Sequence, residues 1–313
     1  MREWIATECL LFEMNTGLTY PAKLLLFGEY AILHGADGLA VPLTSFQGHW
    51  TYSVLSNDHN AQRQLPEFSL WLTREMPEVF GDGAFLKAVE TGIWFESDIP
   101  EGCGIGSSGS LVAAVLAEFG DKTYLQTIEG DLLAIKATLA KMECFFHGSS
   151  SGFDPLVSYV NKPVHIKDFL PNVISGLPEL AGIHFFLIHS GETRITSQWV
   201  NHFNDLMLGI GYYNAFIKGY IPVHQALMDA YFSGDSAAFY ARFQILSVLQ
   251  RDIFADMIPP NLQNIWQSGI SSGQYCLKLC GAGGGGYFMG ITADLNILKQ
   301  FQAKGFNCLP IQF

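Results

Sequence analysis

The sequence predicts an α+β protein built from two domains. The chain has 313 residues, more than a single hydrophobic core usually serves. Hydrophobic residues make up 49% of it and charged residues 15%, which is enough for two cores and too apolar for a disordered chain. Strand and helix patterns alternate without an internal repeat. We expect an N-terminal domain over residues 1–175 and a C-terminal domain over residues 176–313.

Apolar runs and helical periodicity define the elements of the first half. In its last helix, Leu132, Leu139 and Met142 recur at the spacing of a half-buried helix face. The expected strands cover residues 19–26, 38–43, 50–55 and 92–97, and the expected helices cover residues 83–91, 108–119 and 129–146.

The second half begins with a buried strand over residues 184–189. It follows a Pro- and Gly-containing stretch at residues 167–181, which marks the expected domain boundary. The chain ends with two strands around a glycine loop, then a helix and a last strand. The expected helices cover residues 194–209, 211–219, 222–232, 235–255, 260–269 and 293–304, and the expected later strands cover residues 275–279, 287–291 and 306–311.

Charge and cysteine content exclude several classes of protein. A formal net charge of −12 argues against a nucleic acid partner, because phosphate backbones are bound by basic patches. No apolar run is long enough for a membrane span, and the first residues lack the pattern of a secretory signal. We therefore expect a cytoplasmic protein with no membrane partner. The cysteines form no C-x-x-C pair and are expected to be free thiols: Cys9, Cys103, Cys144, Cys276, Cys280 and Cys308.

A glycine-rich segment at residues 100–111 is the most informative feature of the chain. Gly102, Gly104 and Gly106 precede two serines and an apolar helical run. The backbone N–H groups of such a loop can converge on an anion, and the helix N-terminus behind them adds its dipole. We call residues 102–106 the first glycine loop and expect it to bind phosphate.

Other interpretations of this segment are weaker. Residues 104–109 match the dinucleotide pattern G-x-G-x-x-G, which needs a strand leading directly into the loop and an acidic residue about 20 positions later. Here four residues separate the expected strand at 92–97 from Gly102, and Glu118 and Asp121 end a helix. A Walker loop is excluded, because no Gly-Lys-Ser/Thr sequence follows. A glycine-rich turn capped by Ser107 or Ser108 is the structural alternative.

Lys23 lies within the otherwise apolar strand at residues 19–26. A lysine is seldom buried unless it is paired or functional. Such a lysine can neutralise a transferring phosphoryl group or polarise an attacking hydroxyl. The alternative is an edge-strand lysine that faces solvent. Further along, His34 precedes Gly35, where a residue that caps a turn is the simpler interpretation.

Five glycines within six residues lie between the strands expected at 275–279 and 287–291. A short hairpin turn needs one or two glycines, and each glycine costs chain entropy on folding. We call residues 281–286 the second glycine loop. Its composition predicts that the backbone approaches a ligand or the first glycine loop.

Two carboxylates flank a bend of glycine and serine. Glu143 lies on the helix at 129–146, and the Gly-Ser-Ser-Ser-Gly sequence after it could fold Asp154 back into the same cavity. Paired carboxylates near a phosphate loop suggest that one holds Mg²⁺ and the other handles a proton. Taken alone, the simpler interpretation is that Glu143 is a surface residue and Asp154 caps the next helix, Pro155–Val160.

Together these segments resemble, in order, the motifs of the GHMP kinase superfamily, and the likeness is closest to mevalonate kinases. Residues 20–35 resemble the first motif, residues 100–110 the ATP loop and residues 278–286 the third motif. The segment from His147 to Asp154 is similar to the mevalonate kinase form of the catalytic aspartate segment. The resemblance implies a ribosomal protein S5 domain 2-like N-terminal domain with a left-handed βαβ crossover. It also implies a ferredoxin-like C-terminal domain, with ATP between the two.

The resemblance further implies an activity and roles for single residues. The activity is ATP-dependent phosphorylation of a metabolite hydroxyl, with mevalonate as the first substrate and ATP and Mg²⁺ as cofactors. A homodimer is compatible with it. Asp154 and Lys23 are implied as catalytic, and Ser108 and Glu143 as Mg²⁺ ligands. The implied ATP contacts are Gly102, Gly104, Ile105, Gly106, Ser107, Ser108, Gly109 and Ser110, and the implied substrate contacts are Lys23, Glu29, His34, Asp154, Thr196, Gly281, Ala282 and Gly283.

The chain departs from the mevalonate kinase pattern at three positions. Tyr30 stands where those enzymes generally have histidine, and Gly-Glu-Tyr is commoner in phosphomevalonate kinases. Ser150 replaces a proline and Gly109 an alanine. Phosphomevalonate kinase or another GHMP kinase is therefore the main alternative.

Two more distant alternatives conflict with the residues present. Diphosphomevalonate decarboxylases share the ATP loop but generally lack counterparts of Lys23 and Glu143. A non-catalytic binding homologue should have lost at least one of Lys23, Ser108, Glu143 and Asp154, and this chain keeps them all.

Overall fold

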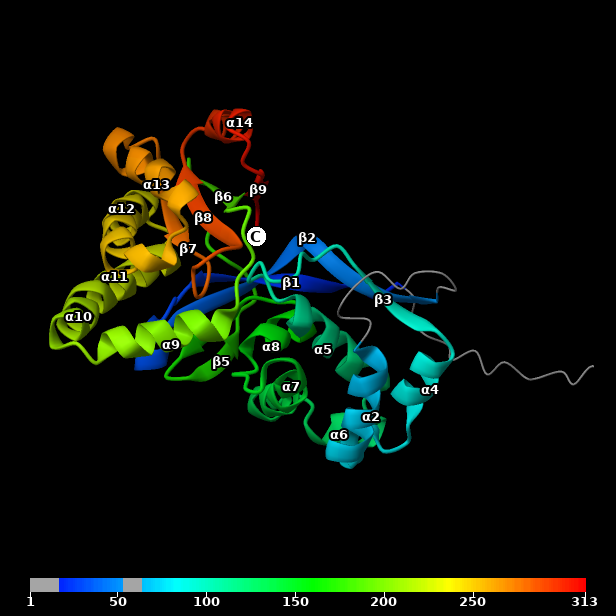
Figure 1. Ribbon diagram of the computed structural model, residues 1–313. Helices are drawn as coiled ribbons and strands as arrows, with labels where there is room; N and C mark the ends of the chain where they lie inside the picture. The colour runs from blue at the N-terminus through cyan, green and yellow to red at the C-terminus, as the bar shows by residue number, and fades with distance from the viewer. Residues whose placement is uncertain (1–16, 53–63) are drawn as a thin grey trace, which may run out of the picture.

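The computed structural model describes residues 17–52 and 64–313, which form two sheets with helices packed around each. Figure 1 shows β1, β2 and β3 of the first sheet lying above a group of helices, and the second sheet, β6 to β9, beside α11 to α13. The first sheet has five strands and the second has four. This arrangement confirms the two-domain α+β fold expected from the sequence. The boundary between residues 175 and 176 stays a prediction.

One long strand organises the first sheet. Strand β2 (Gly38–Tyr52) pairs antiparallel with β1 (Tyr20–Phe27) along most of its length. On its other side, β2 pairs with β3 (Ile93–Ser97) and with β4 (Val164–Lys167). Strand β5 (Leu170–Val173) pairs antiparallel with β4 and completes the sheet. Because β3 and β4 both run antiparallel to β2, the crossover between them joins parallel strands; its left-handedness stays a prediction.

One expectation for this sheet was wrong. The sequence predicts separate strands at residues 38–43 and 50–55, but β2 is one continuous strand, which pairs with β1 along one side and with β4 and β3 at the two ends of the other. Residues 53–55 lie outside the described residues. The stretch at 167–181, where the domain boundary is expected, contains β5, and the boundary itself stays a prediction.

The helices of the first half pack on one side of this sheet. Helix α5 is buried along most of its length, as its run of Ala, Val and Leu requires. Helices α2, α3 and α6 are not anticipated from the sequence. The helices are α2 (Leu65–Glu75), α3 (Pro77–Phe80), α4 (Ala84–Glu90), α5 (Ser107–Phe119), α6 (Lys122–Thr127), α7 (Leu132–His147) and α8 (Phe153–Val160), with a 3₁₀ turn η1 at Ala31–His34.

The second sheet has the ferredoxin-like strand order. Its strands are β6 (His184–His189), β7 (Tyr275–Leu279), β8 (Tyr287–Thr292) and β9 (Cys308–Ile311). They lie in the order β7-β8-β6-β9, and every neighbouring pair is antiparallel. Helices separate β6 from β7 and β8 from β9, which is the βαββαβ pattern of that fold.

The helices of the second half lie close to their expected positions, with one correction. The helix expected at residues 211–219 is a short α10 followed by a π-helical turn, η2. No helix among the described residues is long and apolar enough to cross a membrane. The elements are α9 (Thr196–Met207), α10 (Ile210–Asn214), η2 (Ala215–Tyr220), α11 (Ile221–Phe232), α12 (Ser236–Ile253), η3 (Ala255–Met257), α13 (Pro260–Ser272) and α14 (Asn296–Ala303).

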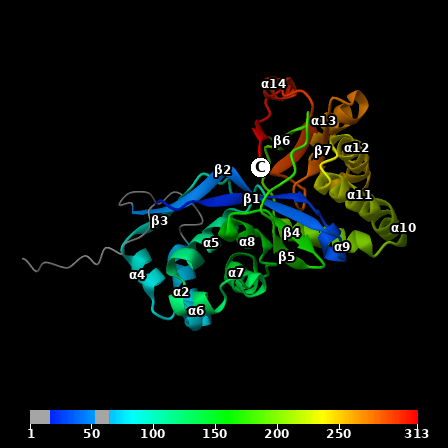
Figure 2. The ribbon, with the colours of Figure 1, turned by 180° about the vertical axis from the view of Figure 1, so that it is seen from behind.

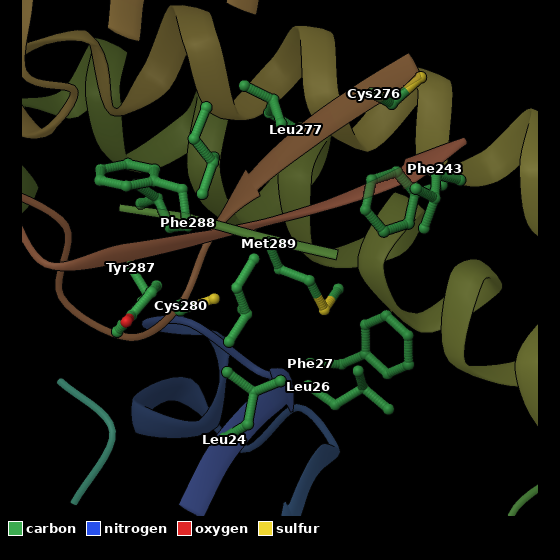
Figure 3. Close-up of a cluster of buried hydrophobic side chains, with 14 of the residues drawn as sticks. Leu24, Leu26, Phe27, Phe243, Cys276, Leu277, Cys280, Tyr287, Phe288 and Met289 are labelled. Carbon is green, nitrogen blue, oxygen red and sulfur yellow. The ribbon is translucent and has the colours of Figure 1, made fainter. Parts of the chain in front are cut away.

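The end of β1 joins the two halves through a shared core. Seen from behind, β1 and β2 run beneath the second sheet (Figure 2). Leu24 and Phe27 of β1 lie in the same buried cluster as Leu277, Phe288 and Met289 of β7 and β8 (Figure 3). Apolar burial of this kind fixes where the first motif sits relative to the second glycine loop.

The cysteines that the structure describes are free, as expected: Cys103, Cys144, Cys276, Cys280 and Cys308. Cys9 lies outside the described residues.

Candidate active site

Lys23 and Asp154 form an ion pair at the centre of the predicted site. The Lys23 Nζ atom on β1 lies 2.7 Å from Asp154 Oδ2 on α8, and the side chains are 7% and 44% exposed. Lys23 is therefore a buried, paired lysine and not an edge residue that faces solvent. Helix α8 is capped by Gly152, so Asp154 lies in its first turn and is not the cap.

The first glycine loop wraps around Lys23 and leads into an uncapped helix. The Lys23 N–H donates to the Ile105 carbonyl at 2.8 Å. A Cβ atom at Gly106 would lie 2.7 Å from Lys23 Cγ, so the close approach requires glycine. Helix α5 begins at Ser107 and has no side-chain cap. Its first N–H groups consequently have no acceptor within the helix and present the positive end of its dipole.

Ser108 and Glu143 lie side by side near this helix end. The Ser108 hydroxyl donates to Glu143 Oε1 at 3.1 Å and lies 2.9 Å from His147 Nε2. The Ser150 hydroxyl donates to the other oxygen of Glu143. Burial, together with the nearby charge of Asp154, raises the pKa of Glu143 to about 7. The carboxylate is thus held by two hydroxyl donors in a place that disfavours its charge.

These residues fit a magnesium ion that is completed by phosphate oxygens. Among the described residues no group of three or more His, Cys, Asp or Glu side chains could hold a metal. Mg²⁺ commonly takes one or two protein oxygens and fills its remaining positions with water and substrate phosphate. Ser108 and Glu143 supply two adjacent hard oxygen donors, which matches that pattern.

Three predicted ATP contacts lie behind the loop. The Ser110 hydroxyl donates to the Tyr20 carbonyl and its N–H to the Gly106 carbonyl, so both donors are used within the protein. The Ile105 side chain is fully buried. A Cβ atom at Gly109 would lie 3.0 Å from Pro155 N, so glycine here lets α8 approach α5. Their contact with ATP stays a prediction.

Arg194, which the sequence did not single out, joins the two glycine loops. Its guanidinium donates to the carbonyls of Cys280 at 3.0 Å, Gly283 at 3.2 Å and Gly285 at 3.3 Å. Its backbone N–H donates to the Gly102 carbonyl at 3.0 Å. Burial lowers the pKa of Arg194, and Asp154 is among the groups that oppose this shift. The second glycine loop therefore approaches the first, as its composition predicted.

Glu29 and Tyr30 contact the second glycine loop and its strand. The Lys278 ammonium donates to Glu29, and both side chains are fully buried. Burial raises the pKa of Glu29, and Lys278 opposes the shift. The Tyr30 hydroxyl donates to the Ala282 carbonyl at 2.7 Å. Glu29 was predicted to contact substrate; the structure places it in this buried pair, and substrate contact stays a prediction.

Two predicted substrate residues lie further out. His34 is exposed, and its ring packs against Phe203 and Phe216 with centroid distances of 5.9 Å and 5.4 Å. Burial lowers its pKa. Thr196 is exposed at the start of α9, two residues after Arg194.

Comparison with known proteins identifies the family. The family model for the GHMP kinases N terminal domain matches residues 72–162, which include the first glycine loop, Glu143 and Asp154. Residues 72–162 are therefore similar to the N-terminal domain of the GHMP kinases. The match confirms the resemblance stated from the motifs. The matched residues include the segment in which the first glycine loop and both carboxylates were predicted to act.

The relatives of this GHMP kinase homologue with curated names include several mevalonate kinases. That of Archaeoglobus fulgidus is 30% identical over 146 residues, which is 44% of this chain and 48% of the relative. That of Pyrococcus horikoshii is 24% identical over 204 residues, 58% of each chain. The chain thus spans about half the length of the curated relatives it matches.

Solved structures of the superfamily share the fold over nearly the whole chain. The Methanococcus jannaschii mevalonate kinase gives a TM-score of 0.62 at 17% identity and covers 95% of this chain and 98% of its own. The Streptococcus pneumoniae phosphomevalonate kinase gives 0.64 at 18% identity and covers 93% and 97%. Lactococcus lactis galactokinase, complexed with galactose, gives 0.64 at 14% identity and covers 95% and 94%. At these identities the likeness establishes the fold alone.

Proposed function

We propose that this GHMP kinase homologue transfers the γ-phosphoryl group of ATP to a hydroxyl of a small metabolite, with mevalonate as the first substrate. The observation that carries the proposal is the Lys23–Asp154 pair, 2.7 Å apart, beside the uncapped start of α5. An acid, a cation and an anion-binding helix end meet there. Phosphoryl transfer asks of a protein mainly such positioning and charge stabilisation.

Asp154 is proposed to handle the proton of the accepting hydroxyl. Its half-exposed carboxylate can accept a hydrogen bond from a hydroxyl, orient it toward the phosphoryl group and take its proton as the new P–O bond forms. Lys23, which is buried and paired with Asp154, stabilises the negative charge that develops on the oxygen.

The first glycine loop and α5 are proposed to hold the phosphates of ATP. The free N–H groups at the start of α5 are the donors that phosphate oxygens accept from. Ser108 and Glu143 would hold Mg²⁺, which supplies charge neutralisation on the phosphates when it is bound. Arg194 places a further buried cation between the loops.

Mevalonate and phosphomevalonate are the two candidate substrates, and different observations favour each. Curated relatives of this chain are named mevalonate kinases, which favours mevalonate. Tyr30, at the position where phosphomevalonate kinases commonly carry tyrosine, favours phosphomevalonate. Its hydroxyl is occupied by the Ala282 carbonyl, so the structure gives Tyr30 a contact within the protein.

A substrate panel tests the proposal. The purified protein, with ATP and Mg²⁺, is offered mevalonate, phosphomevalonate, homoserine and galactose in turn, and ADP release and product mass are measured. Mevalonate-dependent ADP release with formation of phosphomevalonate supports the proposal. Turnover with phosphomevalonate alone would move the assignment to the alternative. ATP binding without turnover of any substrate would identify a non-catalytic homologue, and CO₂ release from diphosphomevalonate would identify a decarboxylase.

A further inference from the structure

We propose that Glu29, Tyr30 and Lys278 are positioning residues that lock the second glycine loop onto the first motif. Glu29 and Tyr30 directly follow β1 and Gly28, and Lys278 lies on β7 just before the loop. The effect on turnover rests on the proposed kinase function. The effect on the loop itself does not, and it can be measured separately.

The ion pair is the first contact of this lock. Lys278 donates to Glu29 and, at 2.6 Å, to the Leu279 carbonyl, and neither ionic side chain is exposed. One carboxylate from the first motif is thereby tied to the last two residues of β7, immediately before the second glycine loop.

Tyr30 makes the second contact from the neighbouring position. Its backbone has φ 57°, in the left-handed region that bulky residues seldom adopt. That conformation turns the ring inward, where it stacks on Phe203 with centroids 4.2 Å apart and donates to the Ala282 carbonyl. A strained tyrosine persists only where its surroundings compensate, and here the compensation is a bond to the loop.

The consequence is the direction in which the loop backbone faces. The Arg194 guanidinium donates hydrogen bonds to the carbonyls of Cys280, Gly283 and Gly285. The Tyr30 hydroxyl donates to the carbonyl of Ala282. No described residue accepts a hydrogen bond from the N–H groups of Ala282, Gly283 or Gly285. With its carbonyls held by side chains, the loop keeps these N–H groups available for an anionic ligand.

A purely stabilising role is the competing explanation, and it makes a different prediction. A buried ion pair is often no more stable than apolar side chains of similar size, whereas removing one partner leaves an uncompensated charge and is strongly destabilising. If Glu29 and Lys278 only stabilise the fold, replacing both with apolar residues should restore stability and activity together. If they position the loop, stability should recover and loop order should not.

The first experiment compares Lys278→Met, Glu29→Leu and the double variant in the full chain. We expect each single variant to lower the unfolding temperature, and the double variant to recover at least half of that loss. In the double variant, hydrogen exchange at the Gly284 and Gly286 amides, which donate to the Met257 and Glu192 carbonyls, should stay at least about tenfold faster than in the wild-type protein, because opening of the loop no longer breaks the ion pair. The exposed pair Lys141–Glu78 offers the control, Lys141→Met, which should leave this exchange unchanged.

The second experiment removes one hydroxyl. Tyr30→Phe keeps the ring stack and loses the bond to Ala282, so exchange at residues 281–286 should rise and kcat should fall by about tenfold, with the KM for ATP changed much less. Tyr275→Phe is the matched control, because its buried hydroxyl donates to the Ile265 carbonyl, away from the loop. If Tyr30→Phe and the double variant both exchange at the wild-type rate, these residues do not hold the second glycine loop and the inference is wrong. If the wild-type protein shows no turnover, the proposed function is wrong, and the exchange rates alone test whether these residues hold the loop.

Discussion

Both loops are rich in glycine, but their peptide groups are oriented in different ways. In the first loop the glycines lead into a helix whose first N–H groups are uncapped, so the helix dipole would favour an anion there. In the second loop no helix follows, and side chains from elsewhere hold the carbonyls. A helix orients its own peptide groups, whereas a loop needs other residues to orient them. This is why side chains hold the carbonyls of the second loop, whereas the carbonyls of Gly102, Ile105 and Gly106 in the first loop accept from backbone N–H groups.

The largest expected effect tests the catalytic pair beside the first loop. Asp154→Asn removes the group that handles the proton but keeps the shape of the side chain. We expect kcat to fall by at least about 10², with nucleotide affinity nearly unchanged, because the helix N-terminus still binds phosphate. Steady-state kinetics and calorimetric titration with an ATP analogue measure the two quantities. Turnover close to wild type would reduce Asp154 to a structural partner of Lys23.

A matched pair of glycines tests how the two loops depend on each other. Gly104 and Gly130 have nearly the same φ, 77° and 78°, so alanine strains both alike. At Gly130 nothing lies within 4 Å of the new methyl, whereas at Gly104 it would overlap the Arg194 guanidinium. That guanidinium is fixed by the carbonyls of the second loop, so it cannot move without releasing them.

We therefore expect Gly104→Ala to lower kcat by about tenfold or more and to speed hydrogen exchange at the Gly284 and Gly286 amides, although the substitution lies in the other loop. Gly130→Ala should change only stability, by about 1 kcal/mol. Equal behaviour of the two variants would show that Arg194 does not couple the loops.

The sequence predicted what depends on local pattern. Lys23, Ser108, Glu143 and Asp154 were found because glycine spacing and charged residues in apolar segments are visible along the chain. The strands and helices at the end of the chain follow from periodicity, whereas their ferredoxin-like arrangement was implied by the family resemblance. The roles of those residues in catalysis remain predictions.

The missed features depend on contacts between distant residues. Arg194 lies in the segment Glu-Thr-Arg-Ile-Thr, whose polar composition indicates an exposed loop. The neighbouring residues give no sign that its guanidinium binds carbonyls about 90 positions away in the sequence. The pairing of Glu29 with Lys278, 249 positions apart, is of the same kind. One signal was available for Lys278: it is a lysine at the end of a strand of apolar residues, the same anomaly that singled out Lys23.

A smaller effect is expected at the predicted metal ligand beside the first loop. Glu143→Gln keeps a hydrogen-bonding side chain but removes the charge that a hard cation prefers. The Mg²⁺ concentration for half-maximal activity should rise by up to about tenfold, and excess Mg²⁺ should restore part of the lost rate. The same excess should restore nothing in Asp154→Asn. An unchanged Mg²⁺ requirement would contradict the assignment of Glu143, and the Ser150 contact would then be its main role.

The smallest effect concerns the support of the second loop and depends on pH. His224 is fully buried, lies 2.8 Å from the Asp37 carbonyl through Nε2, and leaves Nδ1 without a partner among the described residues. Burial lowers its pKa from 6.5 to about 4, and the charge of Lys278 contributes in the same direction. A second proton on this ring would add a cation next to the Lys278–Glu29 pair.

Because the pKa is lower in the folded protein than in the unfolded chain, the neutral ring stabilises the fold fully above pH 6.5. That stabilisation is lost as the pH falls toward 4, since only the unfolded chain takes up the proton. Between pH 6.5 and 5.5 the loss should be about 1 kcal/mol. His224→Gln keeps an N–H donor for Asp37 and does not titrate, so urea unfolding at the two pH values should show a smaller decrease for the variant. Protection of the Gly284 and Gly286 N–H groups against exchange, relative to the intrinsic rate at each pH, should also fall between pH 6.5 and 5.5 more in the wild-type protein than in the variant. Equal slopes for variant and wild type would show that His224 is not the group that makes this half of the site sensitive to acid.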